Sequence, residues 1–133
     1  MKPGIFGAYD IRGVYPKDLN ESSVEELIPA ILKSLKKKSG LKVIVGCDAR
    51  LSSPVLYKAA LRAIERSPNA KSIPVGLMTT PMIYFLVDKL KADGGVIITA
   101  SHNPKNYNGI KVVNAEKLPI SGKEIYEIYK SLR

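Results

Sequence analysis

Apolar residues follow two alternating spacings along this chain, one typical of buried strands and one typical of helices with a single buried face. The short, continuous apolar runs predict four strands, at residues 42–46, 73–77, 94–99 and 110–113. Longer segments with apolar residues three and four apart predict four helices, from residues 22 to 40, 53 to 67, 80 to 90 and 121 to 132. Strands and helices therefore alternate over most of the chain.

The expected helix ends carry recognisable signals. Two capping boxes and two caps followed by proline mark the helix starts, at Ser22, Ser121, Ser53 and Thr80. Gly40 marks the end of the first helix, because glycine readily adopts the left-handed conformation that closes a helix. Pro29 falls inside that helix, where proline kinks or interrupts the hydrogen-bond ladder.

Three strand–helix alternations predict a three-layer α/β/α sandwich, in which helices cover both faces of a mixed, mostly parallel four-stranded sheet. Residues 100–109 are too few for a helical crossover, so we expect the strand at 110–113 to run antiparallel to the strand before it. A length of 133 residues suits one domain of this kind, covering residues 1–133.

Charge and composition narrow the range of partners. The chain has 21 Lys and Arg against 12 Asp and Glu, and the net charge of +9 suggests an anionic partner. The densest basic run, residues 33–42, is typical of a solvated helix end, with a phosphate-binding patch as the alternative. One Cys and one His exclude a disulfide framework, a cysteine-based zinc cluster and a three-histidine metal site. With no nucleic-acid-binding motif and no apolar stretch of membrane-spanning length, we expect a cytoplasmic protein that binds neither nucleic acid nor membrane.

Candidate chemistry gathers after the predicted strands, because ligands of open α/β sheets bind beyond the carboxyl ends of parallel strands. Three segments fall there, at residues 47–53, 78–80 and 100–104. The last places a hydroxyl, an imidazole and an amide on Ser101, His102 and Asn103. Hydrolysis with His102 as base is disfavoured, since adjacent residues of an extended chain point in opposite directions. The remaining readings are a turn without chemistry and a phosphoryl group carried by Ser101 beside Lys111.

Four motifs spread over nearly the whole chain favour the phosphoryl group. They are AYDIRG at residues 8–13, GCDARLSS at 46–53, GLMTTP at 76–81 and TASHNPKNYNGIK at 99–111. In this order they resemble the motifs of the α-D-phosphohexomutases, the phosphoglucomutase/phosphomannomutase family. The resemblance covers the first of that family's four domains, and it implies an N-terminal domain whose three companion domains are absent from this chain.

The resemblance implies that Ser101 is a phosphoserine, which passes its phosphoryl group to a hexose phosphate and regains one from the bisphosphate intermediate. Lys111 and Arg12 would form a cationic pair for proton transfer and charge stabilisation, and His102 would position the phosphate or the sugar. Charge-assisted donors of this kind suit a phosphoryl group. The alternatives without a catalytic role are a solvated turn for Arg12, an exposed strand lysine for Lys111 and a structural role for His102.

Three further residues are implied to serve substrate binding. Tyr9 would approach the sugar, Asn108 would shape the loop, and Arg50 would contact the ligand. For Arg50, an ion pair with Asp48 that braces the loop is an equally good expectation. Gly7 departs from the family pattern, because many dual-specificity members have arginine at this position.

The resemblance thus implies phosphoryl transfer between the 1- and 6-positions of a hexose phosphate, with a hexose 1,6-bisphosphate as intermediate and activator. Mg²⁺ is the implied cofactor of the full enzyme, bound to Ser101 through its phosphate while a missing domain supplies the other ligands. The chain has no D-x-D pattern, so we expect no tight metal binding by it alone. We expect the isolated chain to fold without turning over substrate. The alternative is a stand-alone sugar-phosphate-binding or regulatory module.

Overall fold

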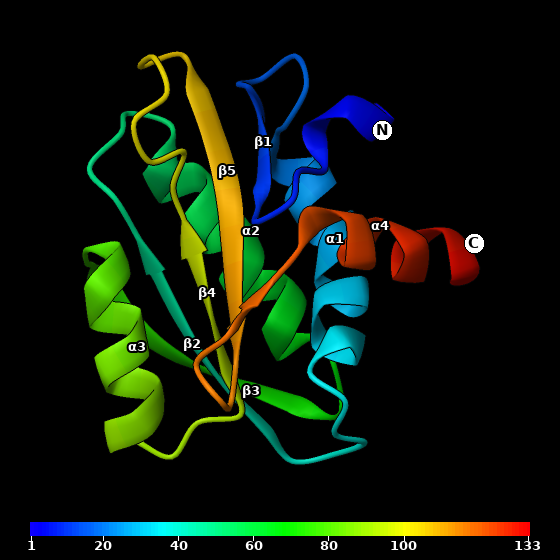
Figure 1. Ribbon diagram of the computed structural model, residues 1–133, viewed down its shortest axis with the longest axis vertical. Coiled ribbons are helices and arrows are strands. Elements are labelled where there is room, and N and C mark those ends of the chain that lie inside the picture. Colours follow the sequence, from blue (N-terminus) through cyan, green and yellow to red (C-terminus); the bar gives the residue numbers. More distant parts are fainter.

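A computed structural model describes all of residues 1–133 and contains one six-stranded sheet. The strands are β1 (Ile11–Val14), β2 (Leu41–Cys47), β3 (Ala70–Leu77), β4 (Gly94–Ile98), β5 (Tyr107–Asn114) and β6 (Pro119–Ile120). The helices are the short 3₁₀ helix η1 (Pro3–Ile5) and the α-helices α1 (Glu21–Ser34), α2 (Ser53–Glu65), α3 (Thr80–Lys89) and α4 (Gly122–Ser131). The strand order is β1-β5-β4-β2-β3, with β6 paired to β5 (Figure 1).

The sheet is mixed, as predicted. Strand β2 pairs in parallel with both β3 and β4, whereas β5 runs antiparallel to β4 and confirms the expectation drawn from the short connection. The predicted count of four strands is wrong, because β1 and β6 also join the sheet, both antiparallel to β5. Neither strand has a clear pattern of its own, since β1 contains Gly13 in only four residues and β6 has two residues.

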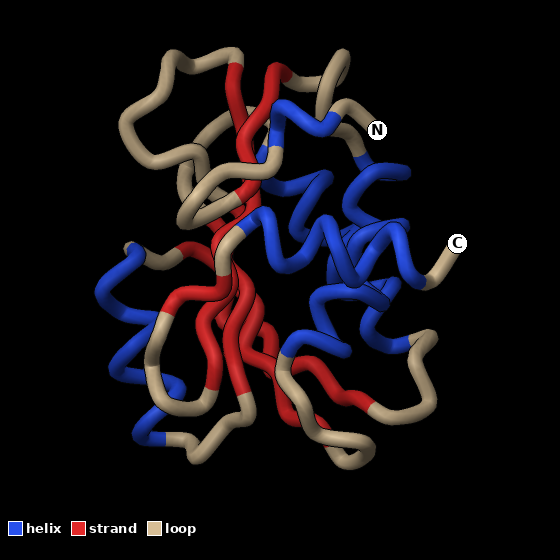
Figure 2. The backbone as a smooth tube through the Cα atoms, turned by 45° about the vertical axis from the view of Figure 1, so that its right-hand side comes forward, coloured by secondary structure: helices blue, strands red, loops and turns tan.

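Helices cover both faces of the sheet, which confirms the three-layer architecture. Helices α1, α2 and α4 lie together on one side of the strands, and α3 lies alone on the other (Figures 1 and 2). The first side holds a core cluster of 27 buried residues, and the α3 side holds a second cluster of 7. No helix of the structure combines the length and the apolar character needed to cross a lipid bilayer.

The helix boundaries differ from the predicted ones by a few residues. Asn20, rather than Ser22, caps α1: its side chain accepts a hydrogen bond from the Ser23 N–H at 3.0 Å, while the Ser23 hydroxyl accepts one from the Asn20 N–H. Helix α1 continues through Pro29 without interruption and ends well before Gly40, because Lys36 takes the left-handed conformation, with φ of +59°.

The other helix starts lie at the prediction or one residue before it. The N-caps of α2 and α3 are Ser52 and Thr79, each one residue before the predicted cap. The Ser121 hydroxyl caps α4 as predicted, accepting a hydrogen bond from the Glu124 N–H at 3.0 Å. These one-residue differences leave each proline in the first turn, where its missing N–H costs no helical hydrogen bond.

Strand register decides which side chains share the α3 face. Arg12 of β1 pairs with Gly109 of β5, and Lys111, two residues further along β5, pairs with Ile97 of β4. Paired residues and residues two apart project to the same face, so Arg12, Lys111 and Ile97 all lie on the face of α3. Helix α3 packs over β4 and β2, so the half of this face formed by β5 and β1 has no helix above it.

Candidate functional site

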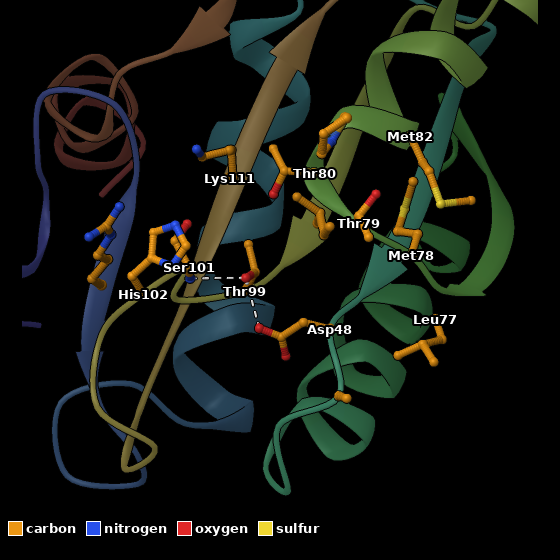
Figure 3. Close-up of a pocket in the computed structure, with 14 residues that line it drawn as sticks. Asp48, Leu77, Met78, Thr79, Thr80, Met82, Thr99, Ser101, His102 and Lys111 are labelled. Atoms are coloured by element: carbon orange, nitrogen blue, oxygen red, sulfur yellow. Dashed lines mark hydrogen bonds between the residues drawn. The ribbon is translucent and has the colours of Figure 1, made fainter.

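A cleft of about 900 Å³ opens at the carboxyl ends of the parallel strands, between the start of α3 and the uncovered part of β5 and β1. Four of the predicted site residues line it, namely Arg12, Ser101, His102 and Lys111. Figure 3 shows Ser101, His102 and Lys111 on one side of the cleft, with the first residues of α3 on the other. The structure therefore brings the four predicted catalytic residues together.

Ser101 follows β4 in a turn with an uncommon backbone conformation. Its φ of +55° lies in the left-handed region, which costs a non-glycine residue about 1–2 kcal/mol. The Ser101 N–H donates a hydrogen bond to the Thr99 hydroxyl at 3.0 Å, and that hydroxyl donates to Asp48 Oδ2 at 2.7 Å. These two bonds, drawn in Figure 3, tie the serine backbone to the end of β2. The surrounding structure thus holds Ser101 in a conformation that it would not adopt alone.

Asp48 is the carboxylate that anchors this network. Its Oδ1 accepts hydrogen bonds from the Ser53 hydroxyl at 2.5 Å and from the Arg50 backbone N–H at 3.1 Å. Burial would by itself raise the pKa of Asp48, but the hydrogen bonds from Ser53, Thr99 and the Arg50 N–H, with the charge of Arg50, outweigh burial and lower it. Asp48 is therefore ionised, and its oxygens are occupied by partners within the chain.

Two cations, Arg12 and Lys111, line the same cleft as Ser101. Arg12 donates its Nε–H to Asp10 Oδ2 at 2.7 Å, which fixes the guanidinium and leaves its two terminal amino groups for the cleft. Lys111 lines the cleft from β5 and forms no ion pair. The accessible charge of the cleft is therefore positive, which suits an anionic group next to Ser101.

The wall formed by β3 and α3 has a different character. Leu77, 68% exposed, and Met82 present apolar surface, while the first turn of α3 presents Thr79 and Thr80. The positive end of the α3 helix dipole is at this turn. Met78 packs against Gly46 so closely that a Cβ at Gly46 would collide with its sulfur. The GLMTTP motif thus forms one wall of the cleft, in agreement with the prediction that residues 78–80 lie beside the functional loops.

Three of the predicted substrate-binding residues do not line the cleft. Asn108 is fully buried on the other face of the sheet, where its amide nitrogen donates to the hydroxyls of Ser52 at 2.7 Å and Ser53 at 3.0 Å. Tyr9 is 69% exposed outside the cleft. Arg50 lies against the backbone of the loop after β4 and forms an ion pair with Asp48 at 3.3 Å. Asn108 and Arg50 shape the loop in this structure, and neither is open to a ligand in the cleft.

Thr99 is the site residue that the sequence interpretation passed over. The predicted strand at residues 94–99 ends on Thr99, and its position two residues before Ser101 is the available signal, because residues two apart share a face of the sheet. No group of three or more His, Cys, Asp or Glu side chains is placed to hold a metal ion. The site as it stands offers hydroxyls and cations, with Asp48 already engaged.

Comparison with known proteins identifies the class. The family model described as phosphoglucomutase/phosphomannomutase, alpha/beta/alpha domain I, matches residues 3–133, and the chain belongs to this family. The family resemblance drawn from the four sequence motifs is thereby confirmed.

Individual relatives are mutases of bacteria and archaea. The chain is 45% identical over 116 residues to a phosphohexose mutase of Xanthomonas campestris, and this match covers 87% of the chain and 25% of the relative. It is 42% identical to a phosphomannomutase of Klebsiella pneumoniae, covering 88% of the chain and 72% of that protein. A phosphomannomutase of Methanocaldococcus jannaschii is 39% identical, over 95% of the chain and 27% of the relative.

A solved structure supports the same fold. The crystal structure of a phosphoglucomutase/phosphomannomutase family protein from Burkholderia thailandensis superposes with a TM-score of 0.85 and 32% sequence identity. The match covers 99% of this chain and 30% of that protein. The chain therefore spans about a quarter of the length of several of its relatives.

Proposed function

We propose that this chain is the phosphoserine-bearing domain of a phosphohexomutase, in which Ser101 carries the phosphoryl group that is exchanged with a hexose phosphate. The observation that carries the proposal is the strained, hydrogen-bonded Ser101 turn in a cleft that also contains Arg12 and Lys111. A phosphoryl group needs positioning and positive charge more than it needs a strong base. Membership of the phosphohexomutase family supports the same assignment.

In the proposed reaction, a hydroxyl oxygen of the sugar attacks the phosphorus of phosphorylated Ser101. The new P–O bond forms as the bond to Ser101 Oγ breaks, and the product is a hexose 1,6-bisphosphate. The proton lost by the sugar hydroxyl balances the proton gained by Ser101 Oγ, and we assign this transfer to Lys111. The free amino groups of Arg12 would stabilise the charge on the phosphoryl oxygens. His102, an exposed residue that lines the cleft, would help to position the phosphate or sugar.

The second half of the reaction returns the other phosphoryl group of the bisphosphate to Ser101. The bisphosphate must therefore reorient between the two transfers, which requires a larger enclosure than this cleft with its open side. Relatives about four times as long as the matched region would supply that enclosure from their remaining domains. We accordingly propose that the chain requires those domains for turnover.

The chain's own donor set does not complete a Mg²⁺ site. Mg²⁺ prefers octahedral oxygen ligands, including one or two carboxylates. Asp48 is the carboxylate that lines the cleft, and its oxygens accept hydrogen bonds from Ser53, Thr99 and Arg50. A phosphate on Ser101 would contribute one oxygen ligand, and the other ligands would come from outside this chain. We assign no step to the metal.

The proposal is tested by following phosphate on Ser101 and turnover together. The chain is incubated with glucose 1,6-bisphosphate and mannose 1-phosphate, alone and with the downstream domains of the Xanthomonas campestris relative added in trans. We expect phosphoserine at residue 101 by mass spectrometry and mutase turnover only when those domains are present. Robust turnover by the chain alone would contradict the requirement for other domains. Sugar-phosphate binding by calorimetry without any phosphoserine would favour the stand-alone binding module instead.

A further inference from the structure

Arg50 uses all five of its N–H groups within the chain. Its Nε–H donates to Asp48 Oδ2, and its two terminal nitrogens donate to three carbonyl oxygens of the loop after β4 and to that of Tyr107, the first residue of β5. The four acceptors are Ser101 at 2.9 Å, Asn103 at 2.7 Å, Pro104 at 2.6 Å and Tyr107 at 3.1 Å. The Arg50 side chain is only 13% exposed. No donor of the guanidinium is left for a ligand.

The carbonyl groups of the loop after β4 suit the planar, multiple donor that the Arg50 guanidinium provides. Four backbone carbonyls that converge on one point repel one another through their dipoles unless a cation lies between them. A planar guanidinium presents several N–H groups in fixed directions, whereas the ammonium of lysine is a compact point charge with three donors. Other bonds of the loop are two backbone turns, from Asn103 to Ala100 and from Tyr107 to Pro104, the Asn103 amide, the Ser101 N–H to Thr99 and the Tyr15 N–H to the Asn106 carbonyl. The carbonyl oxygens of Ser101 and Asn103 accept hydrogen bonds from Arg50 alone.

The two ends of Ser101 are held by different parts of the chain. The Thr99 hydroxyl accepts a hydrogen bond from the Ser101 N–H, and Arg50 donates one to the Ser101 carbonyl oxygen. A residue in the left-handed region persists only when its surroundings hold it there. If the Arg50 bonds were lost, the restraint on the carbonyl side would vanish and Ser101 could relax to an ordinary backbone conformation. The hydroxyl would then leave its position beside Arg12 and Lys111.

We infer that Arg50 is a positioning residue for phosphoryl transfer: it fixes the Ser101 loop from behind and does not contact the substrate. This inference rests on the proposed role of Ser101. It assigns the GCDARLSS motif a task distinct from ligand binding, because Arg50 and Asp48 together join the loop after β2 to the loop after β4.

The first test measures the loop itself. Arg50→Lys keeps the charge and removes the fork, and Arg62→Ala is the matched control, because Arg62 is an exposed arginine of α2 paired with Glu25. We expect Arg50→Lys to accelerate amide hydrogen exchange at Ser101 and Asn103 by at least about tenfold, since charge-assisted hydrogen bonds are lost. Arg62→Ala should leave both amides unchanged. Unchanged exchange in folded Arg50→Lys would overturn the inference.

The second test separates positioning from substrate contact, using the chain supplemented with the downstream domains. A misplaced serine should lower kcat by about 100-fold in Arg50→Lys while KM stays within about twofold. Added guanidinium ion at millimolar concentration should restore part of kcat in Arg50→Gly, and trimethylguanidinium, which is too large and has fewer donors, should not. A raised KM with unchanged kcat would show that Arg50 contacts the substrate, and would overturn the inference. If the unaltered chain shows neither phosphoserine nor turnover, the proposed function fails, and the amide exchange alone decides the role of Arg50.

Discussion

The two faces of the sheet differ in how completely helices cover them. Helices α1, α2 and α4 cover one face and enclose 27 buried residues, among them Ile28 and Ile31 at no measurable exposure. Helix α3 covers only part of the other face, where the buried cluster has 7 residues. Arg12, Lys111 and Ser101 lie beside that uncovered part.

This difference separates the part of the sheet that stabilises the fold from the part that borders the proposed active site. The face covered by α1, α2 and α4, which we call the closed face, buries enough apolar surface to hold the fold, because most of the favourable free energy of folding comes from such burial. The face covered only in part by α3, which we call the open face, keeps polar and charged side chains accessible at the carboxyl ends of the strands. Neighbouring residues of a strand point to opposite faces, so Ile110 packs in the core of the closed face while Lys111 lines the cleft on the open face.

The largest expected effect is on the open face. Ser101→Ala removes the oxygen that we propose to carry the phosphoryl group, so phosphoserine and mutase turnover should be lost completely in the chain supplied with its downstream domains. Stability should hardly change, because Ala and Ser meet the same backbone strain. Mass spectrometry and a turnover assay check this result, with Ser131→Ala of α4 as the control that keeps full labelling. Full turnover by Ser101→Ala would remove Ser101 from its proposed role.

Truncation of a buried side chain on the closed face should instead lower the stability of the fold. Ile31→Ala removes a fully buried side chain of α1 from the 27-residue core cluster, and should lower the free energy of unfolding by about 2–5 kcal/mol. Phe85→Ala on α3 is the matched open-face variant, because Phe85 is 62% exposed, and it should change stability by no more than about 0.5 kcal/mol. Urea denaturation measures both. A loss in Phe85→Ala as large as that in Ile31→Ala would contradict the exposed position of Phe85.

The architecture was largely predictable because it follows from local patterns. The apolar runs located β2 to β5, and the short connection after β4 determined that β5 is antiparallel. Strand β1 was not predicted, since its place in the sheet depends on pairing with β5, about a hundred residues away in sequence. The cap of α1 was misplaced because Asn20 and Ser23 form a reciprocal pair that competes with the Ser22 signal.

The site was predictable only in part, for a geometric reason. Ser101 and Lys111 could be expected near each other from the returning strand, and the structure brings both to one cleft. Asn108 lies within the same motif but on the other face of β5, and the motif as a string does not distinguish the two faces. The choice between ligand contact and loop brace for Arg50 required the positions of four backbone carbonyls, which no sequence pattern specifies.

A smaller effect is expected when the Asp48 network is titrated. The pKa of Asp48 is lower in the folded chain than its ordinary value of 3.8, so ionised Asp48 stabilises the fold at pH values above 3.8. This contribution is lost as the pH falls through the lowered pKa of the folded state. We expect the stability difference between the unaltered chain and Asp48→Asn to be constant from pH 7 to about 5 and to shrink below pH 4. Urea denaturation at each pH measures it. A difference that grows on acidification would contradict the stated direction of the pKa shift.

The smallest expected effect concerns backbone strain on the open face. Ser101→Gly removes the side chain that makes a φ of +55° unfavourable, while it also gives the unfolded chain more freedom, and these two terms partly cancel. We expect a net gain in stability of about 0.5 kcal/mol, against almost no change for Ser101→Ala. Lys36→Gly, at φ of +59° after α1, is the matched control and should give a similar gain. The two glycine variants would then differ only in function, because Ser101→Gly loses the proposed phosphoryl acceptor and Lys36→Gly keeps it. A loss of stability in Ser101→Gly alone would mean that the serine hydroxyl stabilises the turn more than its strained backbone destabilises it.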